Sequence, residues 1–140
     1  MAAFMRPFES QAYAAFRIVV GLLFLLHGTQ KLFGFPVPIP PEMSPPAWIV
    51  YGAGSIEFLG GLLVMIGLLT TWAAFISSGQ MAVAYWMAHG LRFLNAEGGG
   101  WPALSPTVNQ GELAVLYCFA FLYIAARGAG IWSVDGSRSS

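Results

Sequence analysis

The residue whose chemistry stands out is Glu57, a carboxylic acid inside an apolar stretch that covers residues 47–69. In a helix that starts near Ala47, the rise of about 1.5 Å per residue places Glu57 about 15 Å deep, close to the middle of a bilayer. A carboxylate is costly there unless it is protonated, paired or used. Gly54 and Gly61 share its helix face and would let another helix approach closely. We therefore expect Glu57 to point into the protein, either as a structural ion pair or as a proton-handling or ligand-binding group.

Arg17 is a candidate partner for Glu57. It lies about six residues into the first apolar segment, roughly 9 Å deep, and a side chain of its length can reach toward the bilayer centre or back to the interface. Residues of one helix face recur here at spacings of three and four: Arg17, Gly21, Phe24, Gly28 and Lys31. A face with two cations and two glycines is typical of a bundle interior.

Other polar groups gather where the expected helices end. His27 and Lys31 end the first helix, His89 ends the third, and Asn109 and Glu112 open the fourth. Because all four helices are short, we expect these ends to meet in one layer. There they can bind a polar headgroup and move protons, with Glu57, Glu112 and His27 as acid–base groups. The alternative is an interfacial or capping role, because Asn109 suits a helix N-cap and Glu112 the third position of a capping box.

Gln80 is a further polar residue inside the third helix. It precedes His89 by nine residues, which in an α-helix is about half a turn out of phase. We therefore expect Gln80 and His89 to face opposite ways and not to share a site.

The composition indicates a chain that lipid solvates. Its 140 residues are 57% hydrophobic and only 9% charged, whereas soluble domains carry roughly 25% charged residues. The formal net charge is zero and no basic run suggests nucleic acid as a partner. One cysteine, Cys118, cannot form an intramolecular disulfide, and with two histidines it makes a metal site unexpected.

Four segments are apolar enough, and about long enough, for membrane spans: residues 11–33, 47–69, 71–91 and 109–127. The proline-rich residues 35–46 end the first. No small-x-small cleavage site follows its apolar run, so this segment is expected to be retained. The sequence thus predicts an all-α, integral membrane four-helix bundle formed by residues 1–140 as one domain. The partner of its outer surface is the lipid bilayer, and association of several copies is left open.

The distribution of cations gives an orientation. Arg6, Arg127 and Arg138 lie on the side of the termini, against Lys31 and Arg92 on the other. Because cytoplasmic segments carry the excess of lysine and arginine, the termini are expected in the cytoplasm.

Taken together, these motifs resemble the DoxX family of bacterial inner-membrane proteins. The matching residues cover nearly the whole chain in order: Arg17 with Gly21, His27-Gly28-x-x-Lys31-Leu32, Glu57 with Gly60-Gly61, Gly67-x-x-Thr70, Asn109-x-Gly111-Glu112-x-Ala114 and Gly130-x-x-Ser133-x-Asp135. The resemblance implies a four-helix membrane bundle associated with redox chemistry, since the family is similar to the membrane subunit of an archaeal thiosulfate:quinone oxidoreductase. One actinobacterial member is linked with a superoxide dismutase and a sulfurtransferase.

Four functions therefore remain open. The first is a membrane component of an oxidoreductase system, with quinone as cofactor, protein partners in a redox complex, and Arg17, Lys31, His89 and Asn109 as ligand-binding residues. The second is a non-catalytic scaffold or accessory subunit that holds a partner through residues 35–46 and 92–108. A b-type haem between His27 and His89 is permitted by their matching depth but required by nothing else. A transporter is disfavoured because four short spans enclose little space.

Overall fold

The computed structural model describes residues 3–91, 95 and 100–138, and every regular element in these ranges is helical. This confirms the all-α class. Four long helices carry the fold: α1 (Glu9–Phe33), α2 (Ala47–Ile66), α3 (Thr70–Ala84), which continues as a π-helical turn (Tyr85–Gly90), and α6 (Glu112–Arg127). Two short helices, α5 (Pro106–Asn109) and α7 (Val134–Arg138), flank α6. Arg92, which enters the charge count above, lies outside the described residues.

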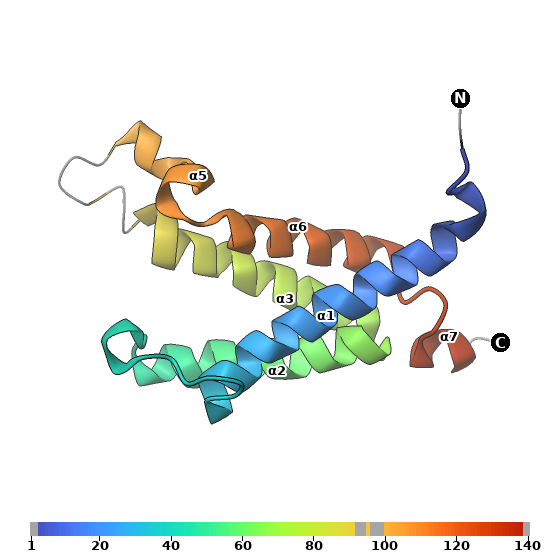
Figure 1. Cartoon of the computed structure of the whole chain (residues 1–140), viewed down its shortest axis with the longest axis horizontal. Coiled ribbons are helices and arrows are strands. Elements are labelled where there is room, and N and C mark those ends of the chain that lie inside the picture. Colours follow the sequence, from blue (N-terminus) through green and yellow to red (C-terminus); the bar gives the residue numbers. More distant parts are fainter. Residues whose placement is uncertain (1–2, 92–94, 96–99, 139–140) are drawn as a thin grey trace.

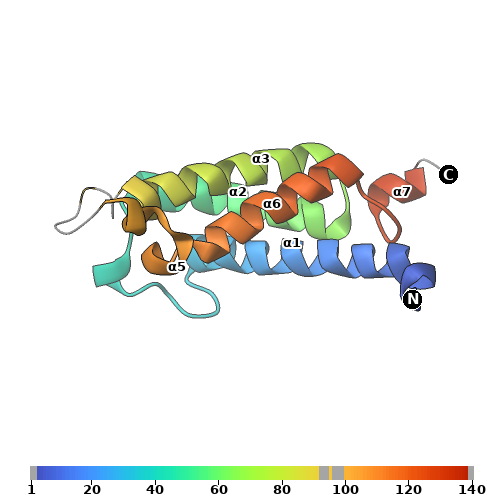
Figure 2. The same cartoon turned by 90° about the horizontal axis from the view of Figure 1, so that it is seen from above.

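The long helices form two pairs. Helix α1 packs along α2, and α3 packs along α6. The pairs are joined by the tight hairpin between α2 and α3, and these two helices spread apart with distance from the hairpin (Figure 1). Both ends of the described chain lie at the hairpin end of the molecule (Figures 1 and 2). The bundle is therefore closed at one end and splayed at the other.

Two of the four expected spans meet the length and hydropathy of a membrane span by themselves, namely Arg6–Phe33 and Ala47–Ile66. Helices α3 and α6 are shorter, at 15 and 16 residues. Sixteen residues reach only about 24 Å, less than the ~30 Å hydrocarbon core. The π-helical turn lengthens α3, whereas α6 starts three residues later than expected because Gln110 adopts a left-handed backbone (φ 60°) and interrupts the helix.

Glycines bring the backbones of α1 and α2 into direct contact. A Cβ atom at Gly21 would lie 2.5 Å from the backbone nitrogen of Met65, and one at Gly28 or Gly61 would overlap the backbone of the facing helix. Such contacts leave no room for any side chain, and small residues are what permits them in membrane helices. The prediction that this face of α1 lies in the bundle interior is confirmed, since Arg17, Gly21, Phe24 and Gly28 are all buried.

The hairpin end is held by two charged residues. Arg17 is fully buried and donates hydrogen bonds to the carbonyl oxygens of Val64 and Met65, which end α2, each at 2.7 Å. It also donates to the carbonyl oxygen of Trp132 at 2.7 Å, which ties in the chain before α7. Arg17, the candidate partner for Glu57, therefore does not pair with it. In the antiparallel α1–α2 pair, Arg17 lies beside the end of α2 rather than its middle.

Asp135 completes this end by capping α3 from α7. Its carboxylate accepts hydrogen bonds from the backbone N–H groups of Leu69 (3.0 Å) and Thr70 (2.9 Å) and from the Thr70 hydroxyl (2.9 Å). These are N–H groups of the first turn of a helix, which a carboxylate satisfies well. The α2–α3 connection is thus fixed on both sides. Arg17 binds carbonyl groups at the end of α2, and Asp135 binds N–H groups at the start of α3.

Substitution of the contact glycines is expected to separate α1 from α2. Gly61→Ala places a methyl group against backbone that cannot move aside, so it should lower the free energy of unfolding by about 1–3 kcal/mol or more. Gly79 is the matched control, because a Cβ atom there meets nothing within 4 Å. Gly79→Ala should be neutral or stabilising by up to about 1 kcal/mol. Thermal unfolding in detergent measures both, and equal effects would contradict the contact.

The cap on α3 is expected to depend on pH. The N–H group of Thr70, followed by that of Leu69 and the Thr70 hydroxyl, holds the pKa of Asp135 below its usual value. Because the folded-state pKa is the lower one, the cap stabilises the fold above pH ~4 and is lost as the pH falls through that lowered pKa. Asp135→Asn should therefore lower the melting temperature at pH 7, and the loss should be smaller at pH 3. Glu42→Gln, at an exposed position, is the control and should have no effect at either pH. A loss for Asp135→Asn that is as large at pH 3 as at pH 7 would contradict a role for the charge.

Candidate functional site

A cavity of about 650 Å³ lies at the splayed end of the bundle. Its walls come from the second half of α1, the first half of α2, the end of α3 and the start of α6. Most of the lining is apolar, and several lining residues on α2 and α3 are also exposed on the outer surface: Trp48, Val83 and Met87. The cavity therefore opens sideways between α2 and α3, where these helices have spread apart.

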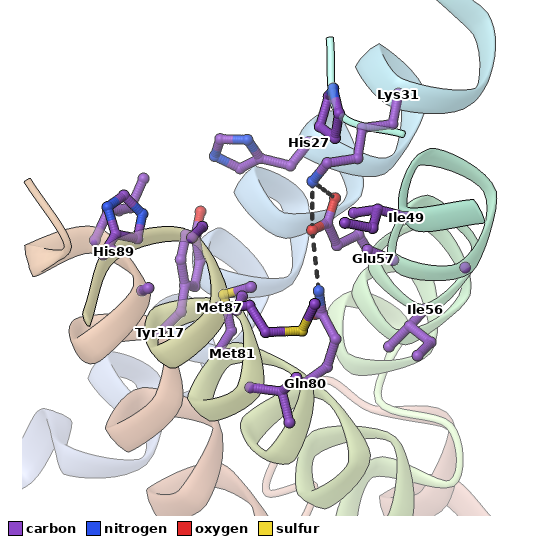
Figure 3. A pocket seen from close by; sticks show the side chains of 18 of the residues that line it. His27, Lys31, Ile49, Ile56, Glu57, Gln80, Met81, Met87, His89 and Tyr117 are labelled. Carbon is purple, nitrogen blue, oxygen red and sulfur yellow. Dashed lines mark hydrogen bonds and ion pairs between the residues drawn. The ribbon is translucent and has the colours of Figure 1, made fainter. Parts of the chain in front are cut away.

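A row of three polar side chains from three helices crosses this cavity (Figure 3). The amine of Lys31 on α1 lies 2.5 Å from Oε1 of Glu57 on α2 and also bonds the second carboxylate oxygen. The amide of Gln80 on α3 donates to Oε1 of Glu57 at 3.3 Å. Glu57 is only 2% exposed, as expected of a residue that points into the protein. Its partner is Lys31, and the two groups form a charge-assisted hydrogen bond.

The glycine contact explains why Lys31 reaches Glu57. A Cβ atom at Gly54 would lie 3.1 Å from Cβ of Lys31, so the lysine stem lies directly over this glycine. Glu57 follows Gly54 by three residues and so lies on the same face one turn further along α2. A larger residue at position 54 would displace the lysine stem and separate the two charges.

Two histidines line the same cavity from opposite sides. The His27 ring on α1 packs edge-on against Tyr117 of α6, with ring centroids 6.0 Å apart. Nδ1 of His89 lies 2.9 Å from the carbonyl oxygen of Asn109. Because a carbonyl only accepts, Nδ1 of His89 carries the proton and Nε2 is its basic nitrogen. Figure 3 shows His27, Lys31 and His89 around one space, so the expected clustering of these three residues is observed.

The π-helical turn accounts for an error in the prediction from sequence. Gln80 and His89 were expected to face opposite ways, yet both line the cavity. Between them the helix changes to π-helical winding over Tyr85–Gly90. Its i→i+5 hydrogen bonds give more residues per turn, which changes the angular position of His89. Such turns are frequent at functional sites.

Asn109 is buried behind the cavity rather than in its lining. Its amide donates to the hydroxyl of Tyr85 (3.2 Å) and the carbonyl oxygen of Ala103 (3.0 Å), and its Oδ1 accepts from the N–H of Gly111 (2.9 Å). The predicted capping box is wrong, because Asn109 ends α5 and Gly111 is the N-cap of α6. Asn109 thereby holds in place the segment whose carbonyl group orients His89.

Glu112 lies outside the cavity. It is the first residue of α6 and is exposed, and the cavity is lined on this helix by Leu113, Ala114 and Tyr117. A carboxylate in the first turn is favourable to the helix dipole. The structure therefore separates two residues that the sequence grouped as acid–base candidates, Glu57 and Glu112.

Sequence reasoning missed two polar contributors to the site, Gln80 as a cavity residue and Tyr117 as the ring beside His27. The signal for Gln80 was its presence as an uncharged polar residue deep in an apolar helix, which is costly unless it has a partner. No signal in a single sequence distinguishes Tyr117 from the aromatic residues packed around it.

Comparison with known proteins agrees with this description. The DoxX family model matches residues 12–90. An uncharacterised protein of Haemophilus influenzae is 42% identical over 125 residues, which is 87% of each chain. No solved structure matches the chain. The chain belongs to the DoxX family and is a membrane protein of that family.

Removal of one partner of the buried ion pair is expected to cost more than removal of both. Lys31→Met strands the Glu57 carboxylate and should lower the free energy of unfolding by roughly 3–5 kcal/mol. The double variant Lys31→Met/Glu57→Gln should recover most of that loss. The exposed pair of Arg127 with Glu9 (3.2 Å) is the control, and Glu9→Gln should cost less than about 1 kcal/mol. If the loss in the double variant equalled the sum of the losses in Lys31→Met and Glu57→Gln, the two charges would not interact.

Proposed function

We propose that this chain is the quinone-binding membrane component of an oxidoreductase system linked to sulfur, thiol or oxidative-stress redox chemistry. The observation that carries the proposal is an apolar cavity that opens sideways between two helices and contains a short row of hydrogen-bonding groups. A lipid-soluble molecule with a flat apolar ring and polar edges fits such a space. The volume of about 650 Å³ is within the range of small-molecule sites.

The polar groups match the edges of a quinone. The Lys31 ammonium has three N–H donors, and Glu57 engages it through its two oxygens, so donor capacity remains for a quinone carbonyl. The second N–H of the Gln80 amide and the His27 ring add further donors at the cavity. Oε1 of Gln80 is buried and has no hydrogen-bond partner among the described residues. A hydroxyl group of the reduced molecule would satisfy this acceptor.

The cavity also holds groups that can exchange protons. A bound quinone supplies redox chemistry by taking up two electrons and two protons to become the hydroquinone, with the electrons coming from a protein partner. In the proposed mechanism, His27 and the basic Nε2 of His89 hold and transfer protons at the cavity wall. Glu57 keeps the Lys31 amine in position, and the apolar lining excludes water. Arg17, Asn109 and Glu112 lie outside this mechanism.

A non-catalytic scaffold or accessory subunit is the second candidate. It is favoured by large apolar side chains that the loop between α1 and α2 leaves exposed: Phe35, Val37 and Met43. Such a surface can hold a partner protein without any chemistry in the cavity. The experiment on quinone binding separates the two candidates.

Quinone binding is expected to quench the fluorescence of Trp48, which lines the cavity. A short-chain benzoquinone should give saturable quenching that Trp48→Phe removes. Gly52→Leu should fill the cavity and weaken binding at least tenfold, because Gly52 lines it and a Cβ atom there meets nothing within 4 Å. Gly79→Leu is the matched control, since position 79 is equally open but does not line the cavity.

The carboxylates provide a second matched pair for the same measurement. Glu57→Gln should weaken quinone binding, because Lys31 loses the charge that positions it, while Glu112→Gln should bind like the wild type. Equal quenching by the wild type, Gly52→Leu and Glu57→Gln would contradict the quinone site and favour the scaffold.

We further propose a multi-pass arrangement in the bacterial inner membrane with the termini in the cytoplasm. Support comes from the arginines at the hairpin end, Arg6, Arg127 and Arg138. A reporter fused after residue 138 should indicate the cytoplasm, and one inserted within residues 101–106 should indicate the periplasm. The reverse pattern would place the cavity in the cytoplasmic half of the membrane.

A further inference from the structure

A second pocket, of about 450 Å³, lies at the opposite end of the molecule from the cavity. It is formed by the N-terminal segment, the first two turns of α1 and the last turn of α6, and its lining combines charged and aromatic residues: Met5, Arg6, Glu9, Ala12, Tyr13, Phe16, Tyr123 and Arg127. None of these residues belongs to the proposed quinone site.

The charged part of this pocket is positive. It contains two arginines, Arg6 and Arg127, and one carboxylate, Glu9, so the lining carries a net charge of +1. Arg127 pairs with Glu9 at 3.2 Å, but the Glu9 side chain is 69% exposed and thus mostly solvated. A guanidinium has five N–H donors, so one such contact leaves Arg127 able to bind a second anion. The two arginines therefore offer a forked set of donors suited to a phosphate.

Aromatic contacts hold Arg127 in place. Its guanidinium lies over the Tyr13 ring, 4.7 Å from the centroid. The Tyr13 hydroxyl in turn donates a hydrogen bond to the carbonyl oxygen of Gly128, and its ring packs edge-on against Tyr123. Such a stacked guanidinium has lost much of its freedom before a ligand arrives, which favours binding.

The apolar part of the pocket leads toward the middle of the bundle. Phe16 and Tyr123 pack with ring centroids 6.2 Å apart, and both are partly exposed. One turn further along each helix, Val19 on α1 and Phe119 on α6 are exposed as well. A positive mouth at the helix ends therefore continues into an apolar surface along the expected spans. This order of charge followed by apolar surface is that of a phospholipid.

We propose that this pocket binds an anionic phospholipid, with the phosphate headgroup between Arg6 and Arg127 and an acyl chain along Phe16, Tyr123 and Phe119. The location suits this ligand, because the anionic surface of the cytoplasmic leaflet attracts basic groups at the ends of spans. A free phosphate shares the headgroup chemistry but makes no use of the apolar surface.

The test is the thermal stability of the purified full-length protein in mild detergent with added lipid. Phosphatidylglycerol should raise the melting temperature of the wild type by several degrees more than phosphatidylcholine at the same concentration. Arg6→Gln and Arg127→Gln should each lose at least half of this difference. Arg6→Gln is the cleaner variant, because Arg127 also contacts Glu9 and Tyr13 within the protein.

Arg138→Gln is the matched control, since it removes the same charge at the same end of the molecule but outside the pocket. It should keep the full response to phosphatidylglycerol. An equal response to both lipids, or equal losses in Arg6→Gln and Arg138→Gln, would overturn the proposal. Stabilisation by inorganic phosphate alone that matches the effect of the lipid would assign the pocket to a free anion instead.

Discussion

Close contact between the backbones of α1 and α2 is the constraint on which the other features depend. On α1, Gly21 lies against the backbone of Met65 and Gly61, and Gly28 lies against the backbone of Glu57 and Phe58. On α2, Gly61 lies against the backbone of Leu25, seven residues, or about two helical turns, from Gly54. Because no side chain separates the two backbones at Gly21, Gly28 and Gly61, these contacts constrain the register of the pair. That register places Lys31 over Gly54 and within reach of Glu57. A buried carboxylate in apolar surroundings requires such a partner.

The same contact sets Arg17 beside the end of α2, and this determines the shape of the molecule. Arg17 and Asp135 bind the two sides of the α2–α3 connection and fasten the chain around α7 to it. With the hairpin end fixed and α1 holding α2, helix α3 diverges toward α6 (Figure 1). The space left between α2 and α3 is the cavity. The hairpin end is therefore fastened by Arg17 and Asp135, and the opening to the surroundings lies at the other end.

Much of this arrangement could be predicted from the sequence because it depends on periodicity within one helix. The buried face of α1 and the inward orientation of Glu57 follow from spacings along the chain. The grouping of His27, Lys31 and His89 follows instead from their positions at helix ends that lie in one layer. Arg17 was the candidate partner considered for Glu57, whereas the structure pairs Glu57 with Lys31, because the partner depends on the register between two helices.

Features that depend on departures from regular helix were not predictable. The π-helical turn brings Gln80 and His89 into one cavity, and no residue type in the sequence indicates such a turn. The break at Gln110 and Gly111 moves Glu112 out of the polar group and makes Asn109 a buried connector.

The central claim is that a quinone enters between α2 and α3 and reaches the polar row of Lys31, Glu57 and Gln80. Photolabelling of the purified protein with an azido-quinone, followed by peptide mass spectrometry, tests this claim most directly. The account predicts label on residues 48–56 of α2 and 80–87 of α3, displaced by unlabelled quinone and lost in Gly52→Leu. Label confined to other exposed surfaces, or unaffected by Gly52→Leu, would contradict it.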